Sequence, residues 1–72
     1  MVNWRRGDYV LVRDGREILV TDDPILARRS YNEEASGSWQ LDLFWVDAVG
    51  RLYDYSNRGG WSLVKDVLVK NA

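Results

Sequence analysis

The chain has 72 residues, a formal net charge of −1 and a pI of about 5.2, and it contains neither cysteine nor histidine. This length predicts one domain over residues 1–72, near the lower size limit for a hydrophobic core without disulfides or metals. The missing cysteines exclude disulfide frameworks and thiolate metal sites, and the missing histidines remove the commonest general base and metal ligand. A dedicated nucleic-acid binder is also disfavoured, because phosphate binding depends on concentrated positive charge.

The composition is rich in aromatic residues, with four Trp, four Tyr and one Phe, and Arg strongly outnumbers Lys. Arg forms bidentate hydrogen bonds and stacks on rings, so this combination is typical of protein–protein contact surfaces. A genomic bias toward Arg codons explains the Arg excess equally well. No apolar run reaches the roughly 18 residues that span a bilayer, and the polar start disfavours a signal peptide. We therefore expect a cytoplasmic protein.

Residues 1–7 are predicted to form an N-terminal arm that carries Trp4, Arg5 and Arg6. Two readings of this arm remain open. In one, Trp4 folds back against the sheet while both arginines stay in solvent. In the other, all three residues contact a partner.

Residues 9–20 predict a β-hairpin that turns at Asp14-Gly15. Two registers compete. A two-residue type I′ turn places Arg13 opposite Arg16, whereas a type I turn with a glycine bulge pairs Val12 with Arg16. We favour the second register, because two like charges in direct opposition destabilise a hairpin.

A helix is predicted to begin at Pro24, because Asp23 is a favourable N-cap and proline is tolerated at the first helical position. The apolar stripe through Ala27, Tyr31 and Ala35 is thin, and the helix is expected to end before the Ser-Gly-Ser stretch that follows. Its arginines and glutamates are expected to form a solvated outer face.

Residues 39–55 form the best-specified stretch, a second β-hairpin. Asp47 and Gly50 begin and end a predicted type I turn with a G1 bulge, which places Trp45 opposite Tyr53. Strand alternation gives this hairpin two apolar faces. One holds Trp39, Leu41, Leu43, Trp45, Tyr53 and Tyr55, and the other holds Asp42, Phe44, Val46, Leu52 and Asp54. Because so short a chain has little material to cover both, we expect one face to stay open to a partner.

The C-terminal part begins with a glycine-containing loop that carries Arg58 and Trp61. Residues 63–69 fit either helical spacing or a valine-rich strand, and the strand is favoured. The predicted fold class is therefore α+β, with a small antiparallel sheet of two hairpins plus a C-terminal strand and one short helix. An SH3-like β-barrel is the alternative.

The residue types that carry most catalysis and metal binding are missing, so we expect no enzyme, no metal and no cofactor. Asp42 and Asp54 are the only carboxylates that the hairpin register brings together, and a sheet this small offers no deep cleft to shift a pKa. Small β-domains use exposed rings to stack nucleic-acid bases, and the candidates for such a platform are Trp4, Tyr9, Tyr53, Tyr55 and Trp61. The acidic residues Asp42, Asp47 and Asp54 on the same hairpin oppose that reading, because they repel a phosphate backbone.

A protein-binding module or inhibitor is the remaining class, supported by the two apolar faces, the aromatic and Arg content and the unpaired strand edges. It is expected to act as a monomer. The predicted contact residues lie in the N-terminal arm, on the hairpin face judged to be less protected and in the C-terminal loop. They are Trp4, Arg5, Arg6, Phe44, Leu52, Arg58 and Trp61.

In its length, its lack of Cys and His and its opening MVNWRRGDYVLV, the chain resembles the small regulators of host RNA polymerase that bacteriophages encode. The resemblance implies a non-enzymatic phage protein that binds bacterial RNA polymerase in the host cytoplasm, inhibits transcription initiation and promotes antitermination. Two alternatives stay open. One is another phage counter-defence inhibitor, such as an anti-CRISPR protein, and the other is a small β-barrel that binds nucleic acid or peptide.

Overall fold

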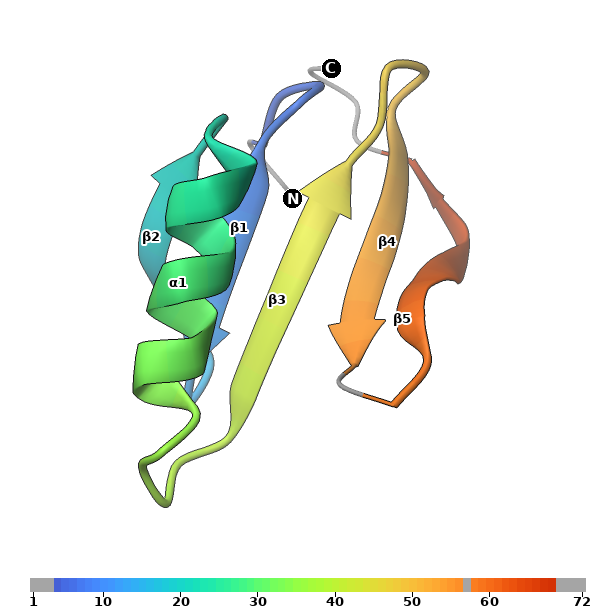
Figure 1. Cartoon of the computed structure of the whole chain (residues 1–72). Helices are drawn as coiled ribbons and strands as arrows, with labels where there is room; N and C mark the ends of the chain where they lie inside the picture. The colour runs from blue at the N-terminus through green and yellow to red at the C-terminus, as the bar shows by residue number, and fades with distance from the viewer. Residues whose placement is uncertain (1–3, 57, 69–72) are drawn as a thin grey trace.

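The computed structural model describes residues 4–56 and 58–68 of the chain. In these residues one helix and five strands follow each other along the sequence (Figure 1). They are β1 (Tyr9–Arg13), β2 (Arg16–Thr21), α1 (Pro24–Glu34), β3 (Leu41–Val46), β4 (Arg51–Ser56) and β5 (Gly60–Leu68). Neighbouring strands pair antiparallel in the order β2-β1-β3-β4-β5. The predicted α+β class is confirmed, with both hairpins and the C-terminal strand in one sheet.

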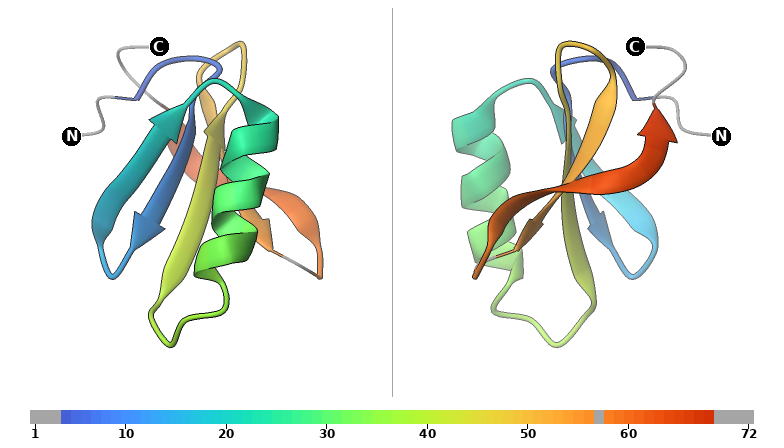
Figure 2. Two further views of the ribbon diagram at one scale, coloured as in Figure 1. Left: turned by 60° about the vertical axis from the view of Figure 1, so that its left-hand side comes forward. Right: turned by 90° about the vertical axis from the view of Figure 1, so that its right-hand side faces the viewer.

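Helix α1 crosses over β1, because it connects β2 to β3 and β1 lies between those strands in the sheet. Its backbone packs on β1, β2 and β3, on one face of the sheet (Figure 1, Figure 2). Strands β4 and β5 extend beyond the part of the sheet that the helix covers.

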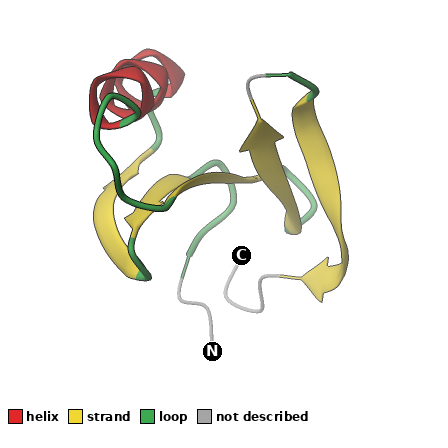
Figure 3. Cartoon of the chain, turned by 90° about the horizontal axis from the view of Figure 1, so that it is seen from below, coloured by secondary structure: helices red, strands yellow, loops and turns green. Residues whose placement is uncertain are grey.

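The sheet is strongly bent, so that its helix-bearing face is concave (Figure 3). The ring centroids of Tyr9 on β1 and Trp61 on β5 lie 5.9 Å apart, although two strands separate β1 from β5. In a flat sheet, strands three positions apart are separated by about 14 Å. Strands β2 and β5 form the two edges of the described sheet, which is open and bent rather than a closed barrel.

The first core lies between the helix and the concave face. Leu11, Ala27 and Leu43 are fully buried there, and Tyr31 is 9% exposed. Helix capping fixes how α1 reaches this core, since Asp23 accepts hydrogen bonds from the first-turn N–H groups, as predicted. The predicted apolar stripe is shorter than expected, because its last member, the alanine after α1, is the exposed C-cap.

A second core lies on the opposite face of the sheet. Val46 and Leu52 form it, and the half-buried side chains of Trp4, Phe44 and Val64 pack against them. The Trp4 and Phe44 rings stack with their centroids 5.4 Å apart. The N-terminal segment and strand β5 therefore cover this face where it is formed by β3 and β4.

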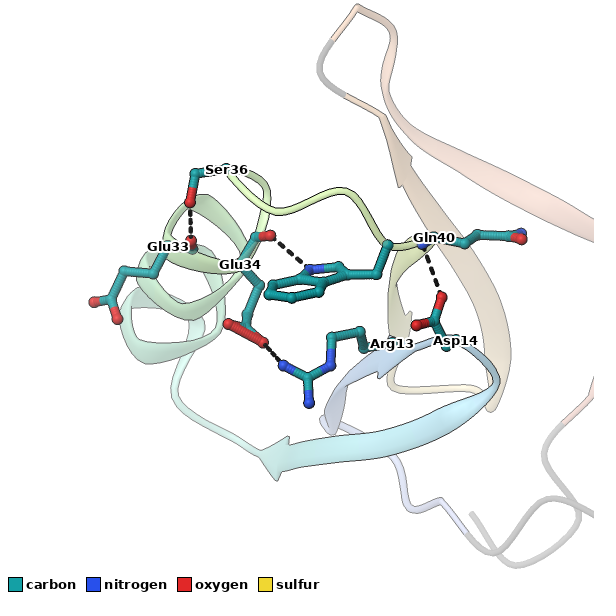
Figure 4. Close-up of polar contacts among 7 residues, drawn as sticks. Arg13, Asp14, Glu33, Glu34, Ser36 and Gln40 are labelled. Carbon is teal, nitrogen blue, oxygen red and sulfur yellow. Dashed lines mark hydrogen bonds and ion pairs between the residues drawn. The ribbon is translucent and has the colours of Figure 1, made fainter.

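The register of the first hairpin was predicted wrongly. Arg13 lies opposite Arg16, and both turn residues have positive φ, 50° at Asp14 and 82° at Gly15, as a type I′ turn requires. The like-charge cost is offset because the Arg13 guanidinium turns to the helix, where Nη1 donates to Glu34 Oε1 at 2.6 Å (Figure 4). A bulge between Leu11 and Val12 then restores the apolar pairing further along the hairpin.

The central hairpin agrees with the sequence analysis except at its start. Trp39 was predicted to lie on the strand, but it precedes β3, and its indole Nε1 donates to the Glu34 carbonyl at 2.8 Å. Gly50 has a φ of 90° and its N–H donates to the Asp47 carbonyl at 3.1 Å, and Trp45 lies opposite Tyr53. The C-terminal segment forms strand β5 as favoured, through Leu68, and residue 69 lies outside the described residues.

Candidate functional site

Five half-buried rings gather on the concave side of the sheet, and we refer to them as the aromatic face. They are Tyr9, Trp45, Tyr53, Tyr55 and Trp61. Cross-strand pairing sets their positions, because Tyr9 lies opposite Trp45, Trp45 opposite Tyr53, and Tyr55 opposite Trp61. The sequence brings large rings to one side of four adjacent strands, and each ring keeps part of its surface in solvent.

Ring centroids in the aromatic face are spaced between 5.1 and 6.1 Å. Trp61 is the member that ties the face together, because its ring packs against Tyr9, Trp45 and Tyr55. These separations are typical of stabilising aromatic pairs. The rings therefore pack on one another as well as on the sheet.

Helix α1 closes only one margin of the aromatic face. Tyr31 meets Tyr55 edge to face, with centroids 5.3 Å apart, and the Arg28 guanidinium lies 4.4 Å above the Tyr55 ring centre. On the opposite margin, Leu63 of β5 pairs with Tyr53 and is 54% exposed. The surface between these margins is therefore open.

A hollow of about 350 Å³ lies where the aromatic face meets the β3–β4 turn. We call it the turn hollow. Its walls come from both hairpin strands and from the turn itself, and its outermost apolar residue, Val49, is 61% exposed. The lining residues are Trp45, Asp47, Ala48, Val49, Arg51 and Tyr53.

Asp47 organises the turn hollow. Its Oδ1 accepts the backbone N–H groups of Val49 and Arg51, at 3.0 and 2.9 Å, and its Oδ2 accepts Arg51 Nε at 2.9 Å. Burial by itself would raise the pKa of Asp47, but the bonds from Arg51 and Val49 outweigh it and lower that pKa below its usual value. Asp47 in turn raises the pKa of Arg51. Both groups are therefore charged near neutral pH.

Two further carboxylates of this hairpin lie on the opposite side of the sheet. Asp54 pairs across the strands with Phe44, one position out of phase with the rings. Burial, and secondly the nearby Asp42, raise the pKa of Asp54. The sequence analysis argued that Asp42, Asp47 and Asp54 repel an anionic ligand at the rings. The structure corrects this argument, because Asp42 and Asp54 face away from the rings and the charge of Asp47 is paired with that of Arg51.

The predicted contact residues are scattered by the fold. Leu52 is only 6% exposed, so its prediction as a contact residue is wrong. Trp4 and Phe44 pack on Leu52 in the second core. For Trp4, this position agrees with the first interpretation of the N-terminal arm, in which Trp4 folds back against the sheet. The Trp4 indole Nε1 is buried and donates to no acceptor among the described residues.

The remaining predicted contact residues are Arg5, Arg6, Arg58 and Trp61. The three arginines are exposed, and Trp61 joins the aromatic face. Alternation had grouped the other hairpin rings correctly, but the face opposite to them was judged the less protected. The structure reverses that judgement, because Trp4 and Val64 cover the second core, while the rings beyond the helix keep part of their surface exposed.

Comparison with protein-family models, with curated proteins and with solved structures finds no significant match to this chain. Among the described residues, no group of three or more acidic, His or Cys side chains is arranged to hold a metal ion. No helix in that same part of the chain is both long and apolar enough to cross a membrane.

Proposed function

We propose that the protein is a non-enzymatic regulator that acts by binding another protein through the aromatic face. The supporting observation is that five large rings and Leu63 keep exposed surface on the concave side of the sheet, although Tyr9, Tyr55 and Trp61 also pack against the helix-covered core. Trp, Tyr and Arg are the residues that most often dominate binding energy at protein interfaces. Rings that are already packed together lose little conformational entropy when a partner covers them.

Bacterial RNA polymerase is the partner we propose on the basis of the resemblance to small phage regulators. In this proposal the protein occupies a polymerase surface in the host cytoplasm, inhibits initiation and promotes antitermination. The direct test is capture of purified polymerase by the tagged full chain, followed by a transcription assay with and without a terminator. Retained binding with no effect on either readout would argue against the regulatory role.

A matched pair of variants tests the binding surface. Leu63→Arg places a charge on the aromatic side of the sheet, and Val20→Arg places the same charge on an exposed strand residue of the other side. We expect the first variant to weaken partner capture by about tenfold or more and the second to leave it unchanged. Thermal melting of both variants controls for folding. Equal losses in the two variants would assign binding to another surface.

Single-stranded nucleic acid is a second candidate ligand. It is favoured by one observation, that Arg28 and Arg51 border the rings while Asp42 and Asp54 face away. Stacked bases and paired phosphates would use this arrangement. The test is Trp fluorescence with a single-stranded oligonucleotide of about 12 residues at rising salt. Binding that weakens steeply with salt supports this candidate, and no binding at low salt removes it.

A further inference from the structure

The guanidinium of Arg51 is oriented by the protein but only partly used by it. Nε donates to Asp47 Oδ2, and Asp47 is itself held by two backbone N–H groups of the turn. Among the side chains that the structure describes, none accepts a hydrogen bond from the two terminal nitrogens of Arg51. The Arg51 side chain as a whole is 52% exposed.

The turn does not depend on those terminal nitrogens. Asp47 Oδ1 bonds the Val49 and Arg51 N–H groups, and Gly50 N–H donates to the Asp47 carbonyl, without any contribution from the end of the guanidinium. A pair of parallel N–H donors at a fixed angle matches the two oxygens of a carboxylate. The arrangement thus offers a bidentate site whose orientation is set before a ligand arrives.

The walls of the turn hollow favour an apolar group beside the charged one. Trp45 and Tyr53 form its aromatic part, with ring centroids 5.1 Å apart, and the exposed Val49 also lines it. At about 350 Å³, the hollow is of the size that takes one or two side chains.

We propose that the turn hollow receives an Asp or Glu side chain of the partner protein, next to an apolar or aromatic residue that packs on Trp45 and Tyr53. The carboxylate takes the terminal nitrogens of Arg51, and Asp47 keeps Nε. This inference rests on the proposed protein-binding function, and it adds the chemistry of the segment that the aromatic face recognises.

The test uses two dipeptides that differ only in charge. N-acetyl-Glu-Phe-amide and N-acetyl-Gln-Phe-amide are titrated into the ¹⁵N-labelled full chain at low salt, and the Trp45 indole, Arg51 Nε–H and Val49 N–H resonances are followed. We expect the Glu dipeptide to bind about fivefold tighter or more, because a charge-assisted bidentate bond replaces a neutral one. Equal affinities, or shifts confined to other residues, overturn the proposal.

Two variants locate the effect. Arg51→Gln is expected to abolish the preference for the Glu dipeptide. Because that change could also loosen the turn, Val49→Asp provides a second variant, which leaves the Asp47–Arg51 pair intact at a 61% exposed position. We expect it to reverse or abolish the preference by repelling the probe carboxylate. If both variants fold and still bind the Glu dipeptide more tightly than the Gln dipeptide, the proposal is wrong.

Partner binding by the Leu63→Arg and Arg51→Gln variants separates this inference from the proposed function. If Leu63→Arg loses the partner protein and Arg51→Gln retains it with unchanged affinity, the aromatic face binds protein and the carboxylate site is wrong. If adenosine monophosphate displaces the Glu dipeptide and binds more tightly, the turn hollow is a nucleotide site and the proposal is also wrong. Loss of partner binding in both variants, with the dipeptide preference as expected, supports both.

Discussion

The two faces of the sheet are built from alternate residues of the same strands, yet they differ in how they are covered. On the second core, Leu52 is nearly inaccessible and Trp4 stacks on Phe44. On the concave face, neighbouring Tyr53 keeps part of its ring in solvent and Leu63 is half exposed. Both faces are apolar in sequence, so hydrophobicity alone does not say which one stays exposed. What decides is the material that folds over each face.

The largest expected effect tests whether the second core is a true core. Leu52→Ala should lower the free energy of unfolding by about 2–4 kcal/mol, since a buried leucine is lost and a cavity is left. The matched change Leu63→Ala, at a 54% exposed leucine of the other face, should cost well under half as much. Urea denaturation measures both values. Similar losses at the two positions would show that the faces are equally buried.

The next effect tests the turn that carries the hollow. Gly50→Val should destabilise the fold by about 1–3 kcal/mol, because a β-branched residue is strained at a φ of 90°. Ala48→Val, at an exposed position of the same turn, is the control and should change the melting temperature little. An unchanged melting temperature in Gly50→Val would disprove the left-handed turn.

The smallest expected effect comes from a comparison of two carboxylates, Asp54 on the side of the second core and Asp47 in the β3–β4 turn. The folded-state pKa of Asp54 is raised, so its ionisation costs stability as pH rises from its ordinary value of 3.8 through the raised value. Asp54→Asn should therefore raise the melting temperature at pH 7, with the gain vanishing below pH 3.8.

Asp47 should behave in the opposite way. Its lowered pKa means that its contribution is present above pH 3.8 and is lost as pH falls through the folded-state value, so Asp47→Asn should destabilise the protein at pH 7. Melting curves of both variants between pH 2 and 7 make the comparison. The same sign of effect for Asp47→Asn and Asp54→Asn at pH 7 would contradict the assigned environments.

Local signals predicted most of the elements. Asp23 and Pro24 set the helix start, and Asp47 and Gly50 set the central turn and the Trp45–Tyr53 register. These succeed because capping and turn geometry depend on residues within a few positions of each other. The first hairpin failed for the converse reason. The repulsion between Arg13 and Arg16 was judged locally, while the compensating ion pair comes from Glu34, 21 positions along the chain.

The candidate site was predicted only in part. The sequence established that the hairpin has two apolar faces, because alternation along a strand fixes which residues share a side. Which face would be closed depended on the bend of the sheet, on the path of the residues before β1 and on where α1 ends. Those are long-range arrangements of whole elements, and no residue pattern within one strand encodes them. The tertiary structure alone therefore assigned Leu52 to the interior and left Tyr53 and Trp61 at the surface.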